Sequence, residues 1–338
     1  MALNSTQSNF EELRVDDNPK EVIDQFYDFF SNIPFIHNLT KADRKRAKDL
    51  PRDAEGKIEV NITEPHILED MDYFRPSAIH FQKYGCFTKL RPNPNPNSEY
   101  GKWIRTEIKR CWYGYIRPSD GEWITGDYYY YLNYCPIQLI KKLPNGQSVR
   151  TVDFPRVWDG QYLVHHYLYN ARLHGHHASE LASRGKGKSF MGAGLLAKRF
   201  KLGESEGVNK KVMSAVTASD KKYVWGPNQI LNMFKYYIDF QSQHTQFPRQ
   251  LLTDSAQLLM WESGFKDKET GVRKGTQNAV IGVTTGVNQD KLNGSRGVLY
   301  LIEEAGIFSN LNNLDQIIIP SVEDCKDVYD LIFMYGTA

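Results

Sequence analysis

The chain has 338 residues, of which 41% are hydrophobic and 24% charged, a balance that is typical of globular proteins and excludes a disordered or fibrous chain. Lysine and arginine number 42 against 40 aspartate and glutamate, so no global basic field indicates a nucleic-acid partner, although local patches can still bind phosphates. The four cysteines form no C-x-x-C pair, which argues against a zinc site, and no apolar run approaches the roughly 20 residues of a membrane-spanning helix.

The N-terminal part of the chain predicts an extension in front of the main domain. Residues 1–20 are polar and predict a flexible arm, whereas the periodic stretch at 21–33 predicts an amphipathic helix. Residues 91–98 alternate proline and asparagine and predict a loop. The aromatic-rich segment 103–139, with its tyrosine run at 128–131, predicts short antiparallel strands whose rings pack against a core rather than stack on bases.

From about residue 150 the composition changes to apolar strand-like runs that alternate with helical stretches. This alternation predicts an α/β domain over residues 150–338 with a central, mainly parallel sheet flanked by helices, preceded by the extension at 21–149. The expected strands are 180–183, 212–217, 278–284, 298–303 and 331–335, and the expected helices are about 188–200, 221–241 and 312–323.

The segment ASRGKGKS follows one of these strands and opens a helix, which is the setting of a phosphate-binding loop. We expect its glycines to let the backbone approach the β-phosphate of ATP, Lys188 to reach the β- and γ-phosphates, and the Ser189 hydroxyl to coordinate Mg²⁺. Ala182 replaces the first glycine of the strict pattern, so a glycine- and lysine-rich surface turn is the alternative. The expected nucleotide-binding residues of the loop are Ala182, Ser183, Arg184, Gly185, Lys186, Gly187, Lys188 and Ser189.

A second motif favours the phosphate-binding loop over the surface turn. The run Val298 to Ile302 is apolar and ends in Glu303 and Glu304, as in a buried parallel strand with two carboxylates at its C-terminal end. Ligands of open α/β sheets bind at these strand ends, so the loop and the carboxylates are expected to share one crevice. We expect Glu303 to hold Mg²⁺ through its water shell and Glu304 to orient the water that attacks the γ-phosphate. The alternative, a solvated acidic pair on the surface, does not fit two carboxylates that follow a buried strand.

The order of these motifs resembles the large terminase subunits of tailed bacteriophages, which are P-loop NTPases of the ASCE type. Further matches are Arg184 inside the loop, Ser295 to Gly297 just before the acidic strand, and Tyr335 to Ala338 after it. The family usually has aspartate where this chain has Glu303. The resemblance implies an ATPase motor that drives double-stranded DNA, without sequence readout, into a procapsid.

The resemblance also implies roles for single residues. Gly336 and Thr337 fall in the coupling motif, which senses the γ-phosphate; an ordinary turn after a strand is the alternative. Arg296 occupies the position of an arginine that completes a neighbouring subunit's site as a catalytic residue, and Arg184 is the competing candidate.

A segment upstream of the loop, residues 154–164, matches the adenine-contacting segment of the family. Gln161 is expected to read the adenine edge, and the alternative is stacking of Trp158 or Tyr162 on the base. Histidines cluster between residues 165 and 177 without carboxylates or cysteines at ligand spacing, so we expect a partly exposed helix and loop instead of a metal site.

The same resemblance implies partners and a setting. They are the portal protein of the procapsid, a small terminase subunit and further copies of this chain in a ring, in the host cytoplasm and without a membrane. The chain ends inside the coupling motif, before the nuclease domain of the family, so no nuclease activity is expected of this fragment. Two rival interpretations are another P-loop helicase or translocase, and a structural module that binds ATP without turnover.

Overall fold

The structure, a computed structural model, describes residues 71–117, 122–143, 145–203, 211–247, 251–284, 297–308, 311, 318–320, 322–324, 327–328 and 331–337. The predicted arm at 1–20, the predicted helix at 21–33, residues 312–317 of a further predicted helix, and Arg296 lie outside the described residues.

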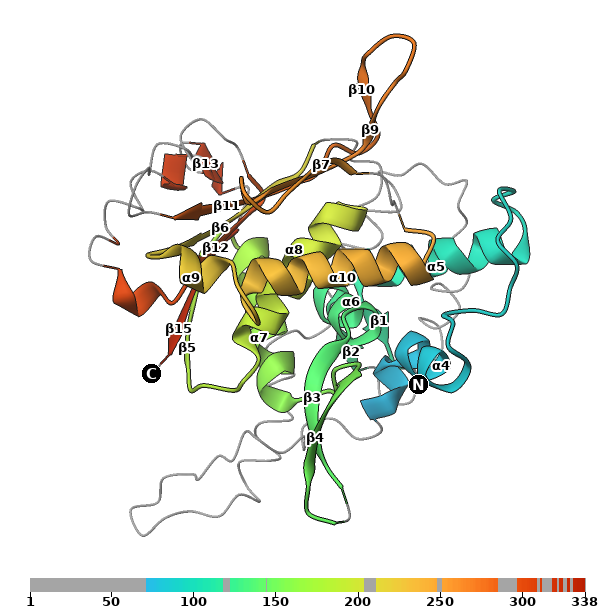
Figure 1. Ribbon diagram of the computed structural model, residues 1–338, viewed down its shortest axis with the longest axis horizontal. Helices are drawn as coiled ribbons and strands as arrows, with labels where there is room; N and C mark the ends of the chain where they lie inside the picture. The colour runs from blue at the N-terminus through green and yellow to red at the C-terminus, as the bar shows by residue number, and fades with distance from the viewer. Residues whose placement is uncertain are drawn as a thin grey trace, which may run out of the picture.

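A seven-stranded sheet with the order β5-β15-β12-β6-β11-β8-β7 forms the centre of the molecule (Figure 1). The strands from β5 to β11 in this order are mutually parallel, and β8 and β7 add an antiparallel hairpin at the far edge. The strands are β5 (Ala178–Ala182), β6 (Met213–Ala218), β7 (Leu251–Ser255), β8 (Met260–Ser263), β11 (Ala279–Thr284), β12 (Leu299–Glu303) and β15 (Leu331–Thr337).

The parallel strands are those that the apolar runs predict, with ends shifted by up to two residues. All five residues of β12 are buried, because the sheet is covered on both faces. On one face, Leu301 and Phe333 belong to the main hydrophobic cluster; on the other, Tyr300 and Ile332 pack with Ile318 in a second cluster. The predicted fold class, a mainly parallel α/β sheet flanked by helices, is therefore confirmed.

Besides the helices of the extension, the main cluster receives side chains from α7 (Asp159–Leu173), α8 (Lys188–Leu202), α9 (Lys221–Val224) and α10 (Ile230–His244). In Figure 1, α10 crosses in front of α8, and the two helices pack against each other. The single helix predicted over 221–241 is wrong, because Gly226 and Asn228 adopt positive φ on either side of a proline and end the first helix.

The extension contains more helix than the sequence predicts. Its elements are η1 (Met71–Phe74), α4 (Pro76–Tyr84), α5 (Glu99–Tyr113), β1 (Tyr115–Ile116), β2 (Trp123–Ile124), α6 (Gly126–Tyr134), β3 (Ile137–Lys142) and β4 (Ser148–Asp153). Short antiparallel pairs are present as predicted, β1 with β2 and β3 with β4. Residues 91–98 are free of regular structure until Ser98 caps α5.

The tyrosine run at 128–131 lies in α6, so its assignment to strands was wrong, although its packing role was right. Thr125 caps the helix by accepting a hydrogen bond from the backbone N–H of Tyr128. The four tyrosines of the run are 0% exposed. A helix that is apolar on all sides is surrounded by other elements, and this burial overrides the strand propensity of its aromatic residues.

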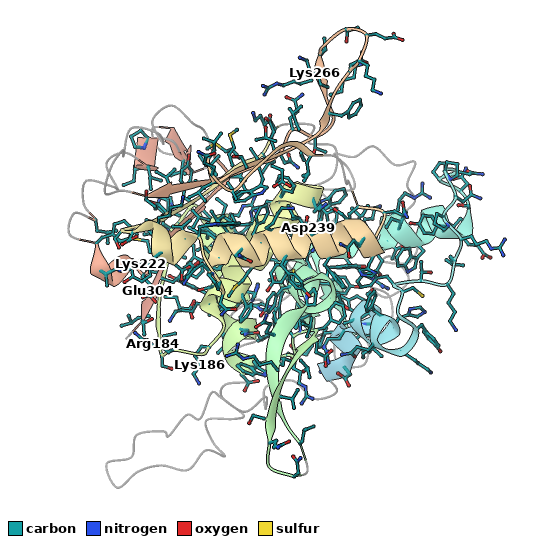
Figure 2. The ribbon with its side chains drawn as sticks, in the orientation of Figure 1. Arg184, Lys186, Lys222, Asp239, Lys266 and Glu304 are labelled. Carbon is teal, nitrogen blue, oxygen red and sulfur yellow. The ribbon has the colours of Figure 1, made fainter. Side chains whose placement is uncertain are left out.

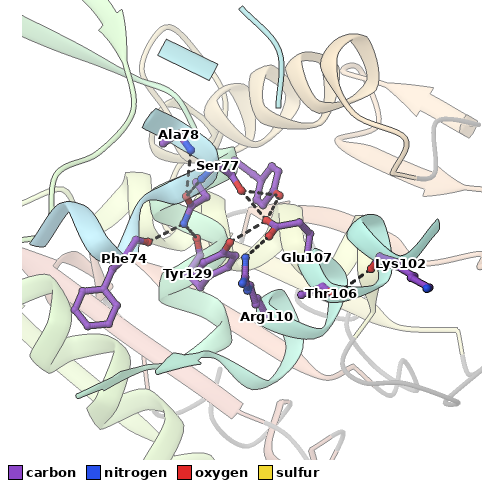
Figure 3. A network of polar contacts seen from close by, with 10 residues as sticks. Phe74, Ser77, Ala78, Lys102, Thr106, Glu107, Arg110 and Tyr129 are labelled. Atoms are coloured by element: carbon purple, nitrogen blue, oxygen red, sulfur yellow. Dashed lines mark hydrogen bonds and ion pairs between the residues drawn. The ribbon is translucent and has the colours of Figure 1, made fainter. Parts of the chain in front are cut away.

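A buried carboxylate, Glu107 of α5, ties the helices of the extension together (Figure 3). It accepts hydrogen bonds from Ser77 Oγ at 2.7 Å and from the hydroxyls of Tyr129 and Tyr134 at 2.8 and 2.5 Å. Arg110 of the same helix donates to it at 2.6 Å. Buried charge is tolerated only when it is hydrogen-bonded in this way, so the network holds α4, α5 and α6 in one arrangement.

A partly buried ionic contact joins the extension to α8, the helix that follows the predicted phosphate loop. Asp127 of α6 lies 2.6 Å from Lys198 Nζ and 3.4 Å from a nitrogen of Arg199. Burial raises the pKa of Asp127, but Arg199 and Lys198 together hold it well below its usual range. The extension is thus anchored to the helix whose first turn belongs to the candidate site.

The other described elements are η3 (Ala305–Ile307), β9 (Phe265–Lys266), β10 (Arg273–Lys274), β13 (Glu323–Asp324) and β14 (Asp327–Val328). The β9–β10 hairpin projects from the body, with Lys266 near its tip (Figures 1 and 2). Within the described part of the chain, every helix is too short or too polar to cross a membrane.

Candidate functional site

The phosphate loop connects β5 to α8 and has the backbone of an anion cradle. Gly185 and Gly187 both adopt left-handed conformations, with φ of 81° and 86°. The left-handed conformation favours glycine at position 187, and a Cβ atom there would also push on the flexible end of Gln161, whose Nε2 would lie 2.7 Å away. Because α8 begins at Lys188, the unpaired N–H groups of its first turn lie at the loop and favour an anion.

Two side chains of this first turn, Lys188 and Ser189, contact β5 and β12. Lys188 is 8% exposed, and its ammonium donates to the backbone carbonyl of Ala182 at 2.6 Å. Ser189 Oγ donates to Glu303 Oε1 at 2.8 Å. The structure thus brings the loop and the acidic strand together in one site, with β15 lying between β5 and β12.

Glu303 is 4% exposed at the C-terminal end of β12. Burial raises its pKa to about 7, the neighbouring Glu304 adds to this rise, and the hydroxyls of Tyr335 and Ser189 oppose it. Its Oε2 atom is buried without a regular hydrogen bond among the described residues.

These features suit a hard divalent cation. Mg²⁺ binds serine hydroxyl and carboxylate oxygens, and Glu303 Oε2 has lone pairs that can coordinate a cation. Among the described residues there is no cluster of three or more histidine, cysteine, aspartate or glutamate side chains arranged for a metal. Mg²⁺ typically binds to one or two protein groups and completes its shell with phosphate oxygens and water, so the small ligand set fits it.

Glu304, the predicted water-orienting residue, is held by the predicted coupling segment. Its carboxylate accepts the backbone N–H of Thr337 at 3.0 Å on one oxygen and the Thr337 hydroxyl at 2.7 Å on the other. Gly336 lies close by, since a Cβ there would be 4.0 Å from Glu304 Oε2. Glu304 itself has a left-handed backbone, with φ of 51°, which is uncommon for a non-glycine residue.

Gly336 and Thr337 are strand residues in the structure, because β15 continues through Thr337 and pairs there with Ala182 of β5. The alternative of an ordinary turn after the strand is therefore wrong. The contact between Thr337 and Glu304 was missed from the sequence, since it depends on which strands lie side by side.

The upstream segment lies against the loop. Gln161 is 6% exposed, and its amide Nε2 donates to the carbonyl of Lys186 at 3.2 Å. Trp158, which precedes α7, is 36% exposed and leaves its ring accessible. Tyr162 is buried, donates to Glu122 and packs on His166, so its ring is not available to a base. Of the two aromatic residues proposed to stack on adenine, Trp158 is the one that the structure leaves accessible.

The remaining predicted site residues fall into two groups. Arg184, exposed, and Lys186, half-buried, lie on the loop at the same end of the molecule as Glu304 (Figure 2). Ser183 is exposed beside them. Arg296 is outside the described residues, so its relation to the site stays a prediction.

Two of the clustered histidines differ from the expectation of partial exposure. His165 and His166 are 2% and 3% exposed on α7, and each ring bonds a backbone carbonyl one turn earlier. Burial lowers the pKa of both rings to about 4. They are neutral core residues because α7 is enclosed between α6 and the sheet.

Comparison with known proteins gives matches only at the level of solved structures. No protein-family model matches the chain, and no curated protein matches it. A mutant of the large terminase ATPase domain from Thermus phage P74-26 matches with a TM-score of 0.35 and 12% identity over 47% of this chain and 58% of that one. The large terminase of bacteriophage HK97 matches with a TM-score of 0.39 and 11% identity over 61% of this chain and 36% of that one.

The chain thus spans less than two thirds of the length of either matched protein. Both belong to the family that the order of motifs resembles. The assignment of the fold rests on the strand order and the phosphate loop described above rather than on these two matches.

Proposed function

We propose that the protein is the ATPase of a viral genome-packaging motor, which hydrolyses ATP and uses the energy to move double-stranded DNA into a procapsid. The observation that carries the proposal is the pair of contacts at the ends of adjacent strands: Ser189 with Glu303, and Glu304 with Thr337. The first supports binding of a magnesium nucleotide, and the second links the candidate catalytic carboxylate to the strand that carries the coupling segment.

In the proposed reaction the N–H groups of the loop and the first turn of α8 bind the β-phosphate, and Lys188 moves from the Ala182 carbonyl to the phosphates. Ser189 and Glu303 would hold Mg²⁺, which neutralises phosphate charge when it is bound. Glu304 accepts a hydrogen bond from the attacking water and orients it toward the γ-phosphate. Gln161 braces the loop at Lys186, and Trp158 is the accessible ring for the adenine.

The link from hydrolysis to movement runs through β15 in this proposal. Thr337 contacts the carboxylate that faces the attacking water, so a change at the γ-phosphate alters the end of β15 directly. The proposed assembly is a ring of copies at the portal of a procapsid in the host cytoplasm, with a small terminase subunit delivering the DNA. Arg296 or Arg184 of one copy would complete the site of the next.

The test is phosphate release from ATP and Mg²⁺, measured across a range of protein concentrations, alone, with double-stranded or single-stranded DNA, and with procapsids. The proposal expects weak turnover by the isolated chain that rises with assembly, and stimulation by double-stranded DNA of any sequence. Lys188→Ala is the matched control and should lose nucleotide binding. Stimulation by single-stranded DNA alone would instead support a helicase, and ATP binding without turnover under every condition would support a structural module.

A further inference from the structure

A row of three polar side chains crosses the sheet beneath α8. Glu180 of β5 pairs with Tyr335 of β15, and Tyr335 pairs with Glu303 of β12, so the three side chains stand on one face of adjacent strands. That face is the one toward α8, because a Cβ at Gly192 of α8 would lie 2.7 Å from the Tyr335 hydroxyl. The proposed reaction uses Glu303 and leaves Glu180 without a role.

Glu180 is half-buried, and one of its two carboxylate oxygens lacks a partner. Its Oε2 atom is buried and makes no hydrogen bond among the described residues. Burial raises the pKa of Glu180 above its ordinary value, and the positive charge of Lys188 offsets only part of this rise. Glu180 and Lys188, both described, form no direct ion pair, so Lys188 stabilises the carboxylate as a nearby positive charge rather than by contact.

The position of Lys188 agrees with this interaction. Its ammonium bonds the carbonyl of Ala182, which lies two residues after Glu180 on the same strand. The lysine is therefore folded back over β5, on the side of the loop where Glu180 lies. To reach a bound phosphate, Lys188 must leave this position, and Glu180 then loses its counter-charge.

We propose that Glu180 is a positioning residue that competes with the phosphates for Lys188 and so weakens nucleotide binding. Interaction energy that Lys188 gains from phosphate is offset by the interaction it loses with Glu180. This competition favours release of the product ADP, and it lets the lysine return to β5 when the site empties. The inference rests on the proposed function only in requiring that Lys188 binds phosphate.

The first experiment measures binding of Mg–ADP and of inorganic pyrophosphate to wild type and Glu180→Gln by calorimetry. Glutamine keeps the shape and removes the charge, so both ligands should bind about tenfold more tightly, equivalent to about 1.4 kcal/mol. The factor should be the same for both ligands because the competition acts on the phosphates. Glu269→Gln, in the exposed β9–β10 hairpin, removes an equal charge far from the loop and should change neither affinity.

The second experiment needs no nucleotide. Urea unfolding of wild type, Glu180→Gln, Lys188→Met and the double variant should give effects that do not add, because each substitution removes the same interaction. If Glu180→Gln folds poorly, Glu180→Leu, of similar volume, should show the same gain in affinity. Unchanged or weaker ADP binding by a folded variant, or additive unfolding energies, would overturn the inference while leaving the proposed function intact. Failure of wild type to bind either ligand would overturn both.

Discussion

Replacing Thr337 with valine tests whether the proposed coupling segment positions Glu304, the proposed catalytic carboxylate. Valine removes the hydroxyl that donates to Glu304 Oε1 at 2.7 Å and keeps the backbone N–H that donates to Oε2 at 3.0 Å. A hydrogen bond to a charged group contributes about 1.5–3 kcal/mol, and losing that amount from the transition state lowers the rate about 10- to 100-fold. Glu304 has an uncommon left-handed backbone, so its position depends on the hydrogen bonds to its side chain. Loss of one of these bonds should therefore displace the carboxylate and lower the rate further.

The assay is steady-state phosphate release together with the dissociation constant of ADP. We expect kcat to fall by this factor in Thr337→Val while ADP affinity stays within about twofold, since the hydroxyl contacts Glu304 rather than the loop. Thr337→Ser keeps the donor and is the matched control, with a rate near that of wild type. Wild-type turnover in the valine variant, or equal losses in serine and valine, would refute the positioning role.

Three further predictions concern stability. His165 is buried with a pKa lowered to about 4, against about 6.5 when unfolded, so its contribution of about 3 kcal/mol is fully present above pH 6.5 and is lost as the pH falls toward 4. Urea midpoints from pH 7 to 4 should therefore fall less steeply in His165→Gln, and parallel curves would contradict this. Asp127→Asn leaves two buried cations of α8 without their carboxylate and should lower the free energy of unfolding by about 3 kcal/mol; an unchanged urea midpoint would argue against a role for the ion cluster. Gly192→Ala places a Cβ 2.7 Å from the Tyr335 hydroxyl and should lower the free energy of unfolding by about 1–3 kcal/mol and weaken ADP binding. Gly160→Ala is the control and should change neither property, because its Cβ meets no atom within 4 Å. Equal behaviour of the two variants in urea unfolding and calorimetry would refute the close contact.

The parts of the site that the sequence predicts are those encoded by neighbouring residues. The glycines at 185 and 187 and the serine at 189 act within one short loop, so their spacing suffices to indicate a phosphate cradle. Likewise, the apolar run of β12 indicates a strand buried on both faces, and the two glutamates that end it then lie at the ligand-binding edge.

The parts that the sequence does not predict depend on which distant segments lie side by side. The contact of Thr337 with Glu304 and the row from Glu180 to Glu303 both follow from the position of β15 between β5 and β12, which no local pattern encodes. The tyrosine run misleads for a related reason, since its strand propensity is outweighed by enclosure on all sides.

The antiparallel hairpin of β7 and β8 was missed because its strands are short. Each has only four or five residues, and their few apolar side chains are interrupted by polar ones. Such runs carry little periodicity, and β8 is identified as a strand by its pairing with β11 and β7.

The central claim is that Glu304 is the carboxylate that orients the attacking water at a nucleotide held by the loop. The most direct measurement is ATP binding and single-turnover hydrolysis by wild type and Glu304→Gln with Mg²⁺, side by side. We expect the variant to bind ATP with near wild-type affinity and to lose hydrolysis almost completely. The amide oxygen of glutamine can still accept the backbone N–H of Thr337 and its NH2 can donate to the Thr337 hydroxyl, but the neutral amide cannot take the proton of the attacking water. Hydrolysis by Glu304→Gln at the wild-type rate would contradict the account.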